Sequence, residues 1–189
     1  KSKPFGYMPF YPGPGLGGHC IPIDPFYLSW KARQFGQPTQ FIELAGQINT
    51  AMPDHVISVL AANLKSKFSK GLAGAKVLLV GVAYKRNVDD VRESPAFRLI
   101  EILEEGGASV EFHDPYVDEI PRTRKHDNLS GRSSVPWDPI AFATYDVALI
   151  CTDHTDVDYA ALVESVPLVI DTRNATADII NDRHKIVKA

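Results

Sequence analysis

Apolar side chains recur every three or four residues between positions 39 and 68, which is the spacing of one face of a long α-helix. Pro53 lies inside this pattern and is expected to kink the helix or to split it in two. At a rise of about 1.5 Å per residue the helix would be about 45 Å long, which is too long for it to be the core of one domain. Its apolar stripe therefore predicts packing partners on both sides. The stripe consists of Phe41, Ala45, Ile48, Met52, Val56, Leu60, Leu64 and Phe68.

From residue 71 onward the pattern changes to alternating buried strands and helices. Ser94 and Pro95 have the form of a helix N-cap followed by proline at the first helical position, which predicts a helix that Gly106 ends. The continuous apolar run at 76–82, typical of a parallel strand covered on both faces, predicts the first strand, and further strands are predicted at 108–113, 145–151 and 168–171, of which 145–151 is expected to be buried. A helix at 157–164, a helical turn at 176–180 and a short last strand at 185–187 complete the prediction.

These elements predict an α/β fold for the stretch 71–189, built on a Rossmann-like parallel sheet in which helices cross between parallel strands. The helical region at 25–70 precedes this domain, and a loop at 1–24 precedes the helices. With 189 residues, 44% of them hydrophobic, the chain is long enough to bury a core.

The first loop is rich in glycine and proline and carries a cysteine. Between Tyr11 and Cys20 it reads Tyr-Pro-Gly-Pro-Gly-Leu-Gly-Gly-His-Cys, so its backbone can approach a ligand with no side chain in the way. The next residues, Asp24 and Pro25, have the form of an N-cap and a first helical residue and predict a helix that Gly36 ends.

Gly13, Gly15 and Gly18 match the G-x-G-x-x-G pattern of dinucleotide-binding loops, but the context argues against that function. The pattern requires a helix that opens at its last glycine, and Pro22 and Pro25 prevent one there. The loop is therefore expected to hold something other than a cofactor pyrophosphate.

Charge and cysteine content exclude several classes of partner. A net charge of -3 with an isoelectric point near 6.1 gives no electrostatic case for binding nucleic acid. The apolar runs are too short for a membrane span, and two cysteines are too few for a disulfide framework, which favours a reducing cytoplasm. The histidines and cysteines lack metal-ligand spacing, so no metal is expected.

Two cationic residues follow predicted strands and are expected to lie at the edge of the sheet formed by the carboxyl ends of the strands, here called the rim. Lys85 follows the first strand and Arg173 the fourth, and open parallel sheets bind ligands beyond the carboxyl ends of their strands. The turn after the first strand lacks the three glycines of a pyrophosphate loop, so a nucleotide would be held by side chains. Other polar residues at these ends are Tyr84, Arg86, Asp114, Thr152, Asp153, His154 and Thr172.

The two cysteines lie in different settings. Cys151 lies inside an apolar strand, which is typical of a buried cysteine that packs as a small hydrophobic residue. Cys20 lies in the glycine-rich loop among polar residues, where a thiol can act as a nucleophile.

The same segments resemble the UDP-glucose and GDP-mannose dehydrogenase family. The resemblance is carried by residues 11–33, by Ala83-Tyr84-Lys85 and by Asp-Asp-Val-Arg-Glu-Ser-Pro at 89–95. The sequence of residues 18–28 is most similar to the branch of the family that acts on UDP-N-acetylhexosamines, particularly UDP-N-acetylglucosamine 6-dehydrogenase. The resemblance covers only the back half of the family's length, so we expect a fragment that lacks the N-terminal NAD-binding Rossmann domain.

The resemblance implies specific roles for residues of the first loop. In the family, the cysteine that corresponds to Cys20 adds to an aldehyde intermediate, and two NAD accept the two hydrides without release of the aldehyde. Asp24 matches the acidic residue that positions water or stabilises the catalytic groups. The backbone of Tyr11, Gly13, Gly15 and Gly17 is expected to line the sugar pocket.

The resemblance also assigns the second half of the site. Tyr84, Lys85 and Arg173 match residues that hold the uridine diphosphate, and Arg92 matches an arginine that contacts the cofactor. Ile23 departs from relatives that have a cofactor-contacting lysine there, so the local NAD contacts are expected to differ. The long helix is expected to form a homodimer with its copy. Two alternatives stay open at this point: a UDP-glucose 6-dehydrogenase, or a UDP-binding and dimerisation module without catalysis of its own.

Overall fold

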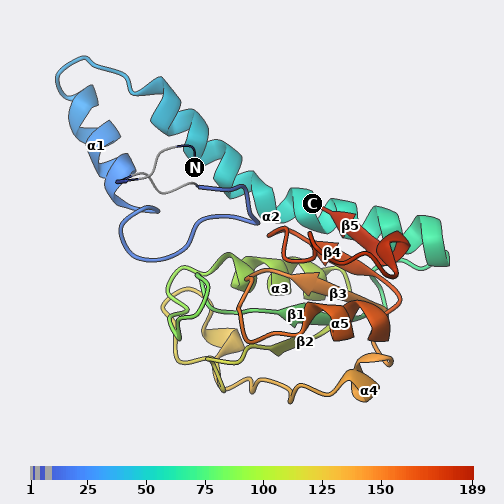
Figure 1. Cartoon of the computed structure of the whole chain (residues 1–189). Helices are drawn as coiled ribbons and strands as arrows, with labels where there is room; N and C mark the ends of the chain where they lie inside the picture. Colours follow the sequence, from blue (N-terminus) through green and yellow to red (C-terminus); the bar gives the residue numbers. More distant parts are fainter. Residues whose placement is uncertain (1, 3–4, 7–9) are drawn as a thin grey trace.

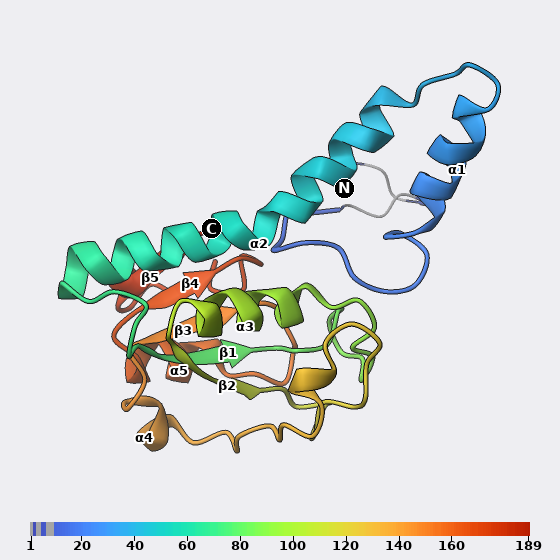
Figure 2. The same cartoon turned by 180° about the vertical axis from the view of Figure 1, so that it is seen from behind.

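The computed structural model describes residue 2, residues 5–6 and residues 10–189, so the predicted loop at 1–24 lies partly outside the described residues. The described chain consists of a helical arm, formed by α1 and α2, and an α/β domain built on a parallel sheet (Figure 1). The second half of α2 lies along the domain, whereas α1 and the first half of α2 extend beyond it (Figures 1 and 2).

The first helix, α1, covers Asp24–Arg33 and begins differently from the prediction. Its N-cap is Ile23, whose carbonyl accepts the N–H of Tyr27 at 3.1 Å. Asp24 is therefore the first helical residue, and the prediction that it caps the helix is wrong. The physical reason is that the Cys20 carbonyl accepts the amides of both Ile23 and Asp24, at 3.0 and 2.8 Å, so the preceding turn closes one residue early.

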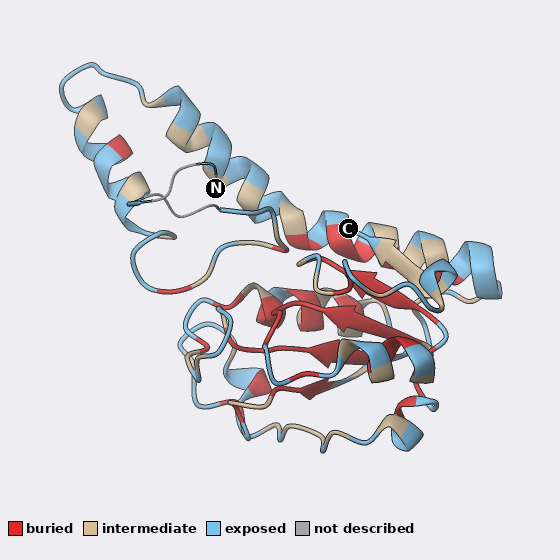
Figure 3. Ribbon diagram, viewed as in Figure 1, coloured by how far each residue is buried: buried red, intermediate tan, exposed pale blue. Residues whose placement is uncertain are grey.

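The second helix, α2, runs without interruption over Gln40–Phe68, so Pro53 does not split it. Its ribbon bends part-way along, as expected where proline removes a backbone donor and crowds the preceding turn (Figure 2). Beyond Pro53 the apolar stripe is fully buried at Leu60 and Leu64, whereas Phe41 before it is 88% exposed. Within the described residues, the predicted stripe is thus buried from Val56 to Leu64, in the second half of the helix, and is exposed at both ends, at Phe41 and Phe68 (Figure 3).

The domain contains one five-stranded parallel sheet in the order β2-β1-β3-β4-β5. The predicted α/β class and the Rossmann-like parallel sheet are confirmed. The strands are β1 Lys76–Val80, β2 Ser109–His113, β3 Val147–Ile150, β4 Val169–Asp171 and β5 Ile186–Lys188. The helices of the domain are α3 Pro95–Glu105, α4 Pro139–Phe142 and α5 Tyr159–Ser165, with 3-10 turns at Asp127–Leu129 and Arg183–Lys185.

Each face of the sheet has its own apolar core, because side chains alternate along a strand. On β1, Val77 and Leu79 belong to the core shared with α2 and α3. Leu78 and Val80 point to the opposite core, which includes Phe142 of α4 and side chains of α5. Both faces of β1 are therefore covered, which explains its uninterrupted apolar sequence.

Most differences from the predicted elements are shifts of one or two residues at their ends. The cap of α3 is as predicted, since the Ser94 hydroxyl accepts the Ala96 amide at 3.3 Å. The helical turn predicted at 176–180 is wrong: residues 175–178 form turns only, because the amides of Ala175 and Thr176 bond to the Asp171 carboxylate. The short helix α4 was not predicted, although Asp138 and the proline after it form its cap and first residue.

The strand order places a reversal point between β1 and β3. The chain moves from β1 outward to β2 and then returns to add β3 on the other side of β1. Ligands of open α/β sheets bind beyond the carboxyl ends of the strands at such a point. The segments that leave β1 and β3 there, residues 81–94 and 151–158, form the sheet side of the candidate site.

Candidate functional site

The glycine-rich loop lies directly against the segment that follows β1. A Cβ added at Gly17 would lie 2.6 Å from the Cβ of Tyr84 and 2.9 Å from the Glu93 carbonyl oxygen, so no side chain fits there. The Gly18 amide donates to the Arg92 carbonyl at 2.8 Å. Glycine at these positions thus lets the loop reach the rim of the sheet, and a role of the loop at a bound sugar stays a prediction.

Gly18 and Gly13 extend the same contact. Gly18 has φ +87°, in the left-handed region that favours glycine, and a Cβ there would lie 2.9 Å from the Tyr84 ring. A Cβ at Gly13 would clash with the guanidinium of Arg173. The loop therefore contacts the segments that follow both β1 and β4.

Cys20 lies where this loop turns into α1. Its carbonyl closes the turn that precedes the helix, and its thiol is exposed. Cys151, in contrast, is 2% exposed, and burial raises the pKa of its thiol to about 12. Of the two, only Cys20 is accessible to a reagent from solution.

Arg92 brings a positive charge into the neighbourhood of Cys20. Its guanidinium binds the Asp90 carboxylate through Nε, at 3.0 Å to Oδ1, and through Nη2, at 2.6 Å to Oδ2. The hydrogen bond to Asp90 raises the pKa of Arg92, and the nearby side chains of Tyr84 and Cys20 add to the rise. The predicted nucleophile and the predicted cofactor arginine therefore lie in the same part of the molecule.

On the rim of the sheet, Asp153 links two arginines. Arg173 donates from Nε to Asp153 Oδ1 at 3.4 Å, and Arg86 donates from Nε to the Asp153 carbonyl at 2.8 Å and from Nη2 to its carboxylate. The arginine held together with Arg173 is thus Arg86, while its neighbour Lys85 is exposed. Arg86 and Asp153 were both expected at the carboxyl ends of strands, but no signal in the sequence assigned either of them a role in the site.

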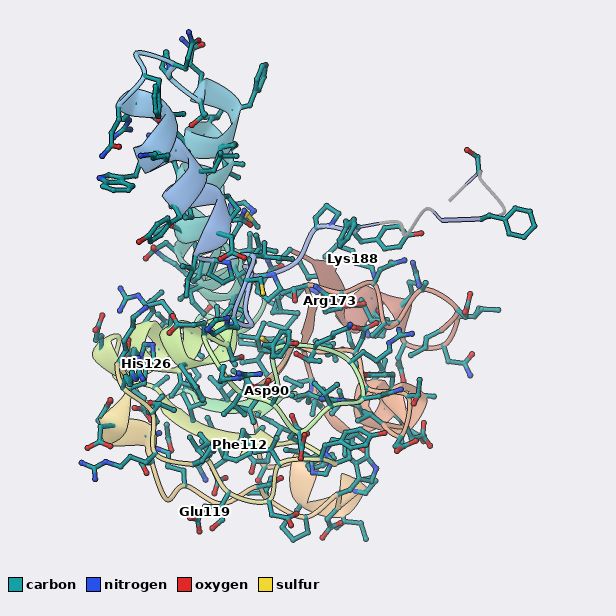
Figure 4. The ribbon with its side chains drawn as sticks, turned by 90° about the vertical axis from the view of Figure 1, so that its left-hand side faces the viewer. Asp90, Phe112, Glu119, His126, Arg173 and Lys188 are labelled. Atoms are coloured by element: carbon teal, nitrogen blue, oxygen red, sulfur yellow. The ribbon has the colours of Figure 1, made fainter. Side chains whose placement is uncertain are left out.

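The segment that carries Arg173 is shaped by a buried carboxylate. Asp171 accepts the amides of Arg173 and Thr176, at 3.0 and 2.9 Å, and the ammonium of Lys188 at 2.6 Å. Burial would raise the pKa of Asp171, but the hydrogen bonds from Lys188 and Thr176 outweigh it and hold the pKa below its usual value. Arg173 and Lys188 lie on the side of the domain that faces the N-terminal loop (Figure 4).

A cavity of about 670 Å³ lies between the arm and the start of α3. Its walls are largely apolar and include Ile21 and Pro22, which directly follow Cys20. The cations that line it are already neutralised: Lys125 pairs with Glu93 and Arg98 with acidic residues of its own helix. The cavity therefore does not have the free positive charge that a diphosphate needs.

Two further findings concern metals and membranes. Within the part of the chain that the structure describes, no three His, Cys, Asp or Glu residues lie close enough together to hold a metal ion. Among the helices of residues 10–189, none combines the length and the apolar character that crossing a bilayer requires.

Comparison with protein families decides the assignment of the chain. The model of the UDP-glucose/GDP-mannose dehydrogenase family, UDP binding domain, matches residues 78–178, which is more than half of the chain. The model of the central domain of the same family matches residues 1–51. The chain belongs to the UDP-glucose/GDP-mannose dehydrogenase family. The resemblance inferred from the sequence is confirmed.

Individual members of the family are similar over most of the chain. It is 32% identical over 173 residues to a UDP-N-acetyl-D-mannosamine dehydrogenase of Methanococcus maripaludis, covering 86% of this chain and 36% of the relative. It is 31% identical over 153 residues to a UDP-N-acetyl-D-glucosamine 6-dehydrogenase of Pseudomonas aeruginosa, covering 80% and 34%.

The fold is shared with solved members of the same family. The structure of a UDP-D-ManNAc dehydrogenase from Pyrococcus horikoshii superimposes with a TM-score of 0.74 at 28% identity, covering 95% of this chain and 39% of that protein. The chain therefore spans well under half of the length of the relatives that it matches.

Proposed function

We propose that this chain forms the central and C-terminal part of an NAD-dependent nucleotide-sugar 6-dehydrogenase that oxidises a UDP-N-acetylhexosamine to the uronic acid. The observation that carries the proposal is the position of Cys20: an exposed thiol lies on a loop that packs directly on Tyr84 and Arg173. Family membership and the names of relatives that act on UDP-N-acetylhexosamines support this substrate class.

The chemistry requires a nucleophile because an alcohol becomes an acid in two oxidations. The Cys20 thiolate adds to the aldehyde carbon formed by the first oxidation, which gives a thiohemiacetal. Loss of a second hydride leaves a thioester, and water cleaves it to the acid and restores the thiol. Asp24 is four residues from Cys20, on the first turn of α1, and in the proposal it positions that water.

The rim of the sheet holds the nucleotide in this proposal. Lys85 and Arg173 supply positive charge to the diphosphate, because Arg173 shares the single Asp153 carboxylate with Arg86 and a net positive charge remains, and Tyr84 contacts the nucleotide beside them. The backbone of the loop, at Tyr11, Gly13, Gly15 and Gly17, lines the pocket of the sugar. The residues fit because the loop and the rim are in contact, which brings the thiol and the cations to the same part of the molecule.

Two molecules of NAD, bound one after the other, would each accept one hydride, and most of the cofactor contacts would come from a part of the enzyme outside this chain. Arg92 fits a place at the cofactor, because its side chain is 66% exposed and lies near Cys20, where the hydride must leave. Its ion pair with Asp90 holds the guanidinium in place.

The nucleophile is tested in the full-length dehydrogenase that contains this chain. Cys20→Ser should stop acid formation and with it steady-state NADH production, because a serine hydroxyl is far less acidic than a thiol and is a poor nucleophile toward the aldehyde. Cys151→Ser is the matched control and should stay active. Unchanged turnover of Cys20→Ser would remove the nucleophile assignment, and comparison of UDP-N-acetylglucosamine, UDP-N-acetylmannosamine and UDP-glucose in the same assay would identify the substrate.

The nucleotide rim is tested by calorimetry of UDP binding. A charge-assisted hydrogen bond contributes about 1.5–3 kcal/mol, so Lys85→Ala should weaken UDP binding by about 10- to 140-fold. Lys65→Ala, at an exposed lysine near the far end of α2, is the control. Equal affinity of the wild type and Lys85→Ala would refute the rim as the diphosphate site.

A second function describes the chain as it stands: a UDP-binding and dimerisation module without turnover of its own. It is favoured by the chain spanning 36% of a dehydrogenase relative and by the exposure of Phe41 and Ile48 on the first half of α2. We expect the chain to bind UDP, to form no NADH and to sediment as a dimer. Sedimentation as a monomer at micromolar concentration would contradict dimerisation through this helix.

A further inference from the structure

Asp114 and His154 form a buried ionisable pair that the proposed mechanism does not use. Asp114 follows β2 and His154 follows β3, and the side chains of both have no exposed surface. His154 Nε2 lies 3.2 Å from Asp114 Oδ2. Buried ionisable groups are costly unless their hydrogen bonds are satisfied, so the contacts of this pair show what it stabilises.

The Asp114 carboxylate binds the start of the segment that leaves β1. Its Oδ2 accepts the amides of Val82 and Ala83 at 2.8 and 2.9 Å, and its Oδ1 accepts the amide of Tyr116 at 2.8 Å. Burial would raise the pKa of Asp114, but the hydrogen bonds from His154 and these amides outweigh it and lower the pKa. The carboxylate is thus ionised, and both of its oxygens accept hydrogen bonds.

His154 binds the end of the same segment. Its Nδ1 accepts the amide of Asn87 at 3.0 Å, so the ring hydrogen is on Nε2 and is donated to Asp114. Asn87 has φ +58° and accepts the Thr155 amide on its own side chain at 2.9 Å. The left-handed residue that turns the chain is therefore bound to the segment after β3 by two hydrogen bonds.

Residues 82–87 are consequently held at both ends by one buried pair, and Tyr84 and Lys85 lie between the two attachments. A further bond, from the Tyr84 amide to the Asp90 carbonyl at 2.9 Å, closes the loop on itself. We propose that Asp114 and His154 are positioning residues that set the conformation of residues 82–87 and thereby place Tyr84 and Lys85 for the uridine diphosphate. This inference rests on the proposed function of the rim.

A positioning role differs from a merely stabilising one in its effect on ligand binding. His154→Phe keeps the ring volume and removes both hydrogen bonds, so the segment is released at Asn87 while the apolar cores stay intact. We expect UDP to bind about tenfold more weakly, the size of one lost charge-assisted contact, at a temperature where circular dichroism shows the variant folded. The amide chemical shifts of residues 83–87 should change as well.

The control removes a partly buried carboxylate contact at the opposite end of the sheet. Asp146 precedes β3 and accepts the Lys76 amide at 2.7 Å and the Lys70 ammonium at 2.6 Å. Asp146→Asn should lower the melting temperature and leave the affinity for UDP unchanged. If His154→Phe behaved in the same way, the pair would be structural only and the inference would be wrong.

A double-mutant cycle separates the two hypotheses further. If His154 acts through Lys85, the loss of affinity in the double variant His154→Phe/Lys85→Ala should be smaller than the product of the single losses. Losses that multiply would overturn the inference. Should His154→Phe fail to fold, His154→Gln, which keeps a donor for Asp114, carries the same cycle and the same outcomes.

The outcomes also distinguish this inference from the proposed function. If the wild-type chain does not bind UDP, the rim itself is wrongly assigned. If the wild type binds UDP in a manner that requires Lys85 and Arg173, while the His154 variants bind it equally well, only the positioning role fails.

Discussion

Replacing Gly17 by alanine tests whether packing on the sheet rim holds the loop that carries Cys20. Gly17 has no positive φ, so the backbone tolerates alanine and the cost is steric. The new methyl group would lie 2.6 Å from the Tyr84 Cβ and 2.9 Å from the Glu93 carbonyl oxygen. The first distance is well below the contact distance of about 3.5–4.0 Å between carbon atoms, and the second is also too short for a Cβ atom beside a carbonyl oxygen.

The magnitude follows from what can move. Neither contacting atom belongs to the flexible end of a side chain, so the loop must shift away from the rim. Inserting a methylene-sized group into a packed contact costs about 1–3 kcal/mol, and the Gly18–Arg92 hydrogen bond at 2.8 Å is strained or lost with it. The opening equilibrium of the loop should therefore increase by about 5- to 140-fold.

The assay is hydrogen exchange of the Gly18 amide, which donates to Arg92. Its protection should fall by that factor, while amides of β1 and β3 keep theirs because the sheet core is untouched. Gly71→Ala is the matched control, since a Cβ there meets nothing within 4 Å. Unchanged protection of the Gly18 amide in Gly17→Ala would refute the claim that the rim holds the loop.

Three more predictions rest on burial and charge. Under native conditions a thiol reagent should modify Cys20 and not Cys151, because burial raises the pKa of Cys151 to about 12; peptide mass spectrometry that finds Cys151 modified first would contradict this. In chemical denaturation, Leu60→Ala should lower the free energy of unfolding by about 2–5 kcal/mol, and Leu44→Ala, at a side chain 51% exposed, by less than about 0.5 kcal/mol; similar effects would mean that the second half of α2 is not part of the core. Burial would raise the pKa of Asp171, but hydrogen bonds outweigh it and hold the pKa below 3.8, so its stabilisation is full above that pH and is lost as the pH falls through the lowered pKa. Asp171→Asn should therefore be less stable than the wild type at pH 6, with a difference that shrinks toward pH 2, and a constant difference would show that this carboxylate does not titrate with unfolding.

Local patterns were sufficient for most elements of the fold, although not for the short helix α4. The uninterrupted apolar run of β1 predicted a parallel strand because a strand covered on both faces has no polar side, and Ser94 with Pro95 predicted the start of α3 because cap and first turn are adjacent in the chain. Asp24 shows the limit of such patterns. The competing acceptor that moved the helix start, the Cys20 carbonyl, becomes effective only when the loop before it has its folded path.

The sequence by itself thus determined the α/β class, the long helix, the family and the difference in setting between Cys20 and Cys151. Only the tertiary structure decided that Gly17 packs on Tyr84, that Asp153 links Arg86 to Arg173, and that Asp114 and His154 hold the segment between β1 and α3. The physical reason is distance along the chain. These contacts join segments tens of residues apart, and those that Asp153 and His154 make with the segment after β1 and with Asp114 exist because β3 is added beside β1 rather than beside β2.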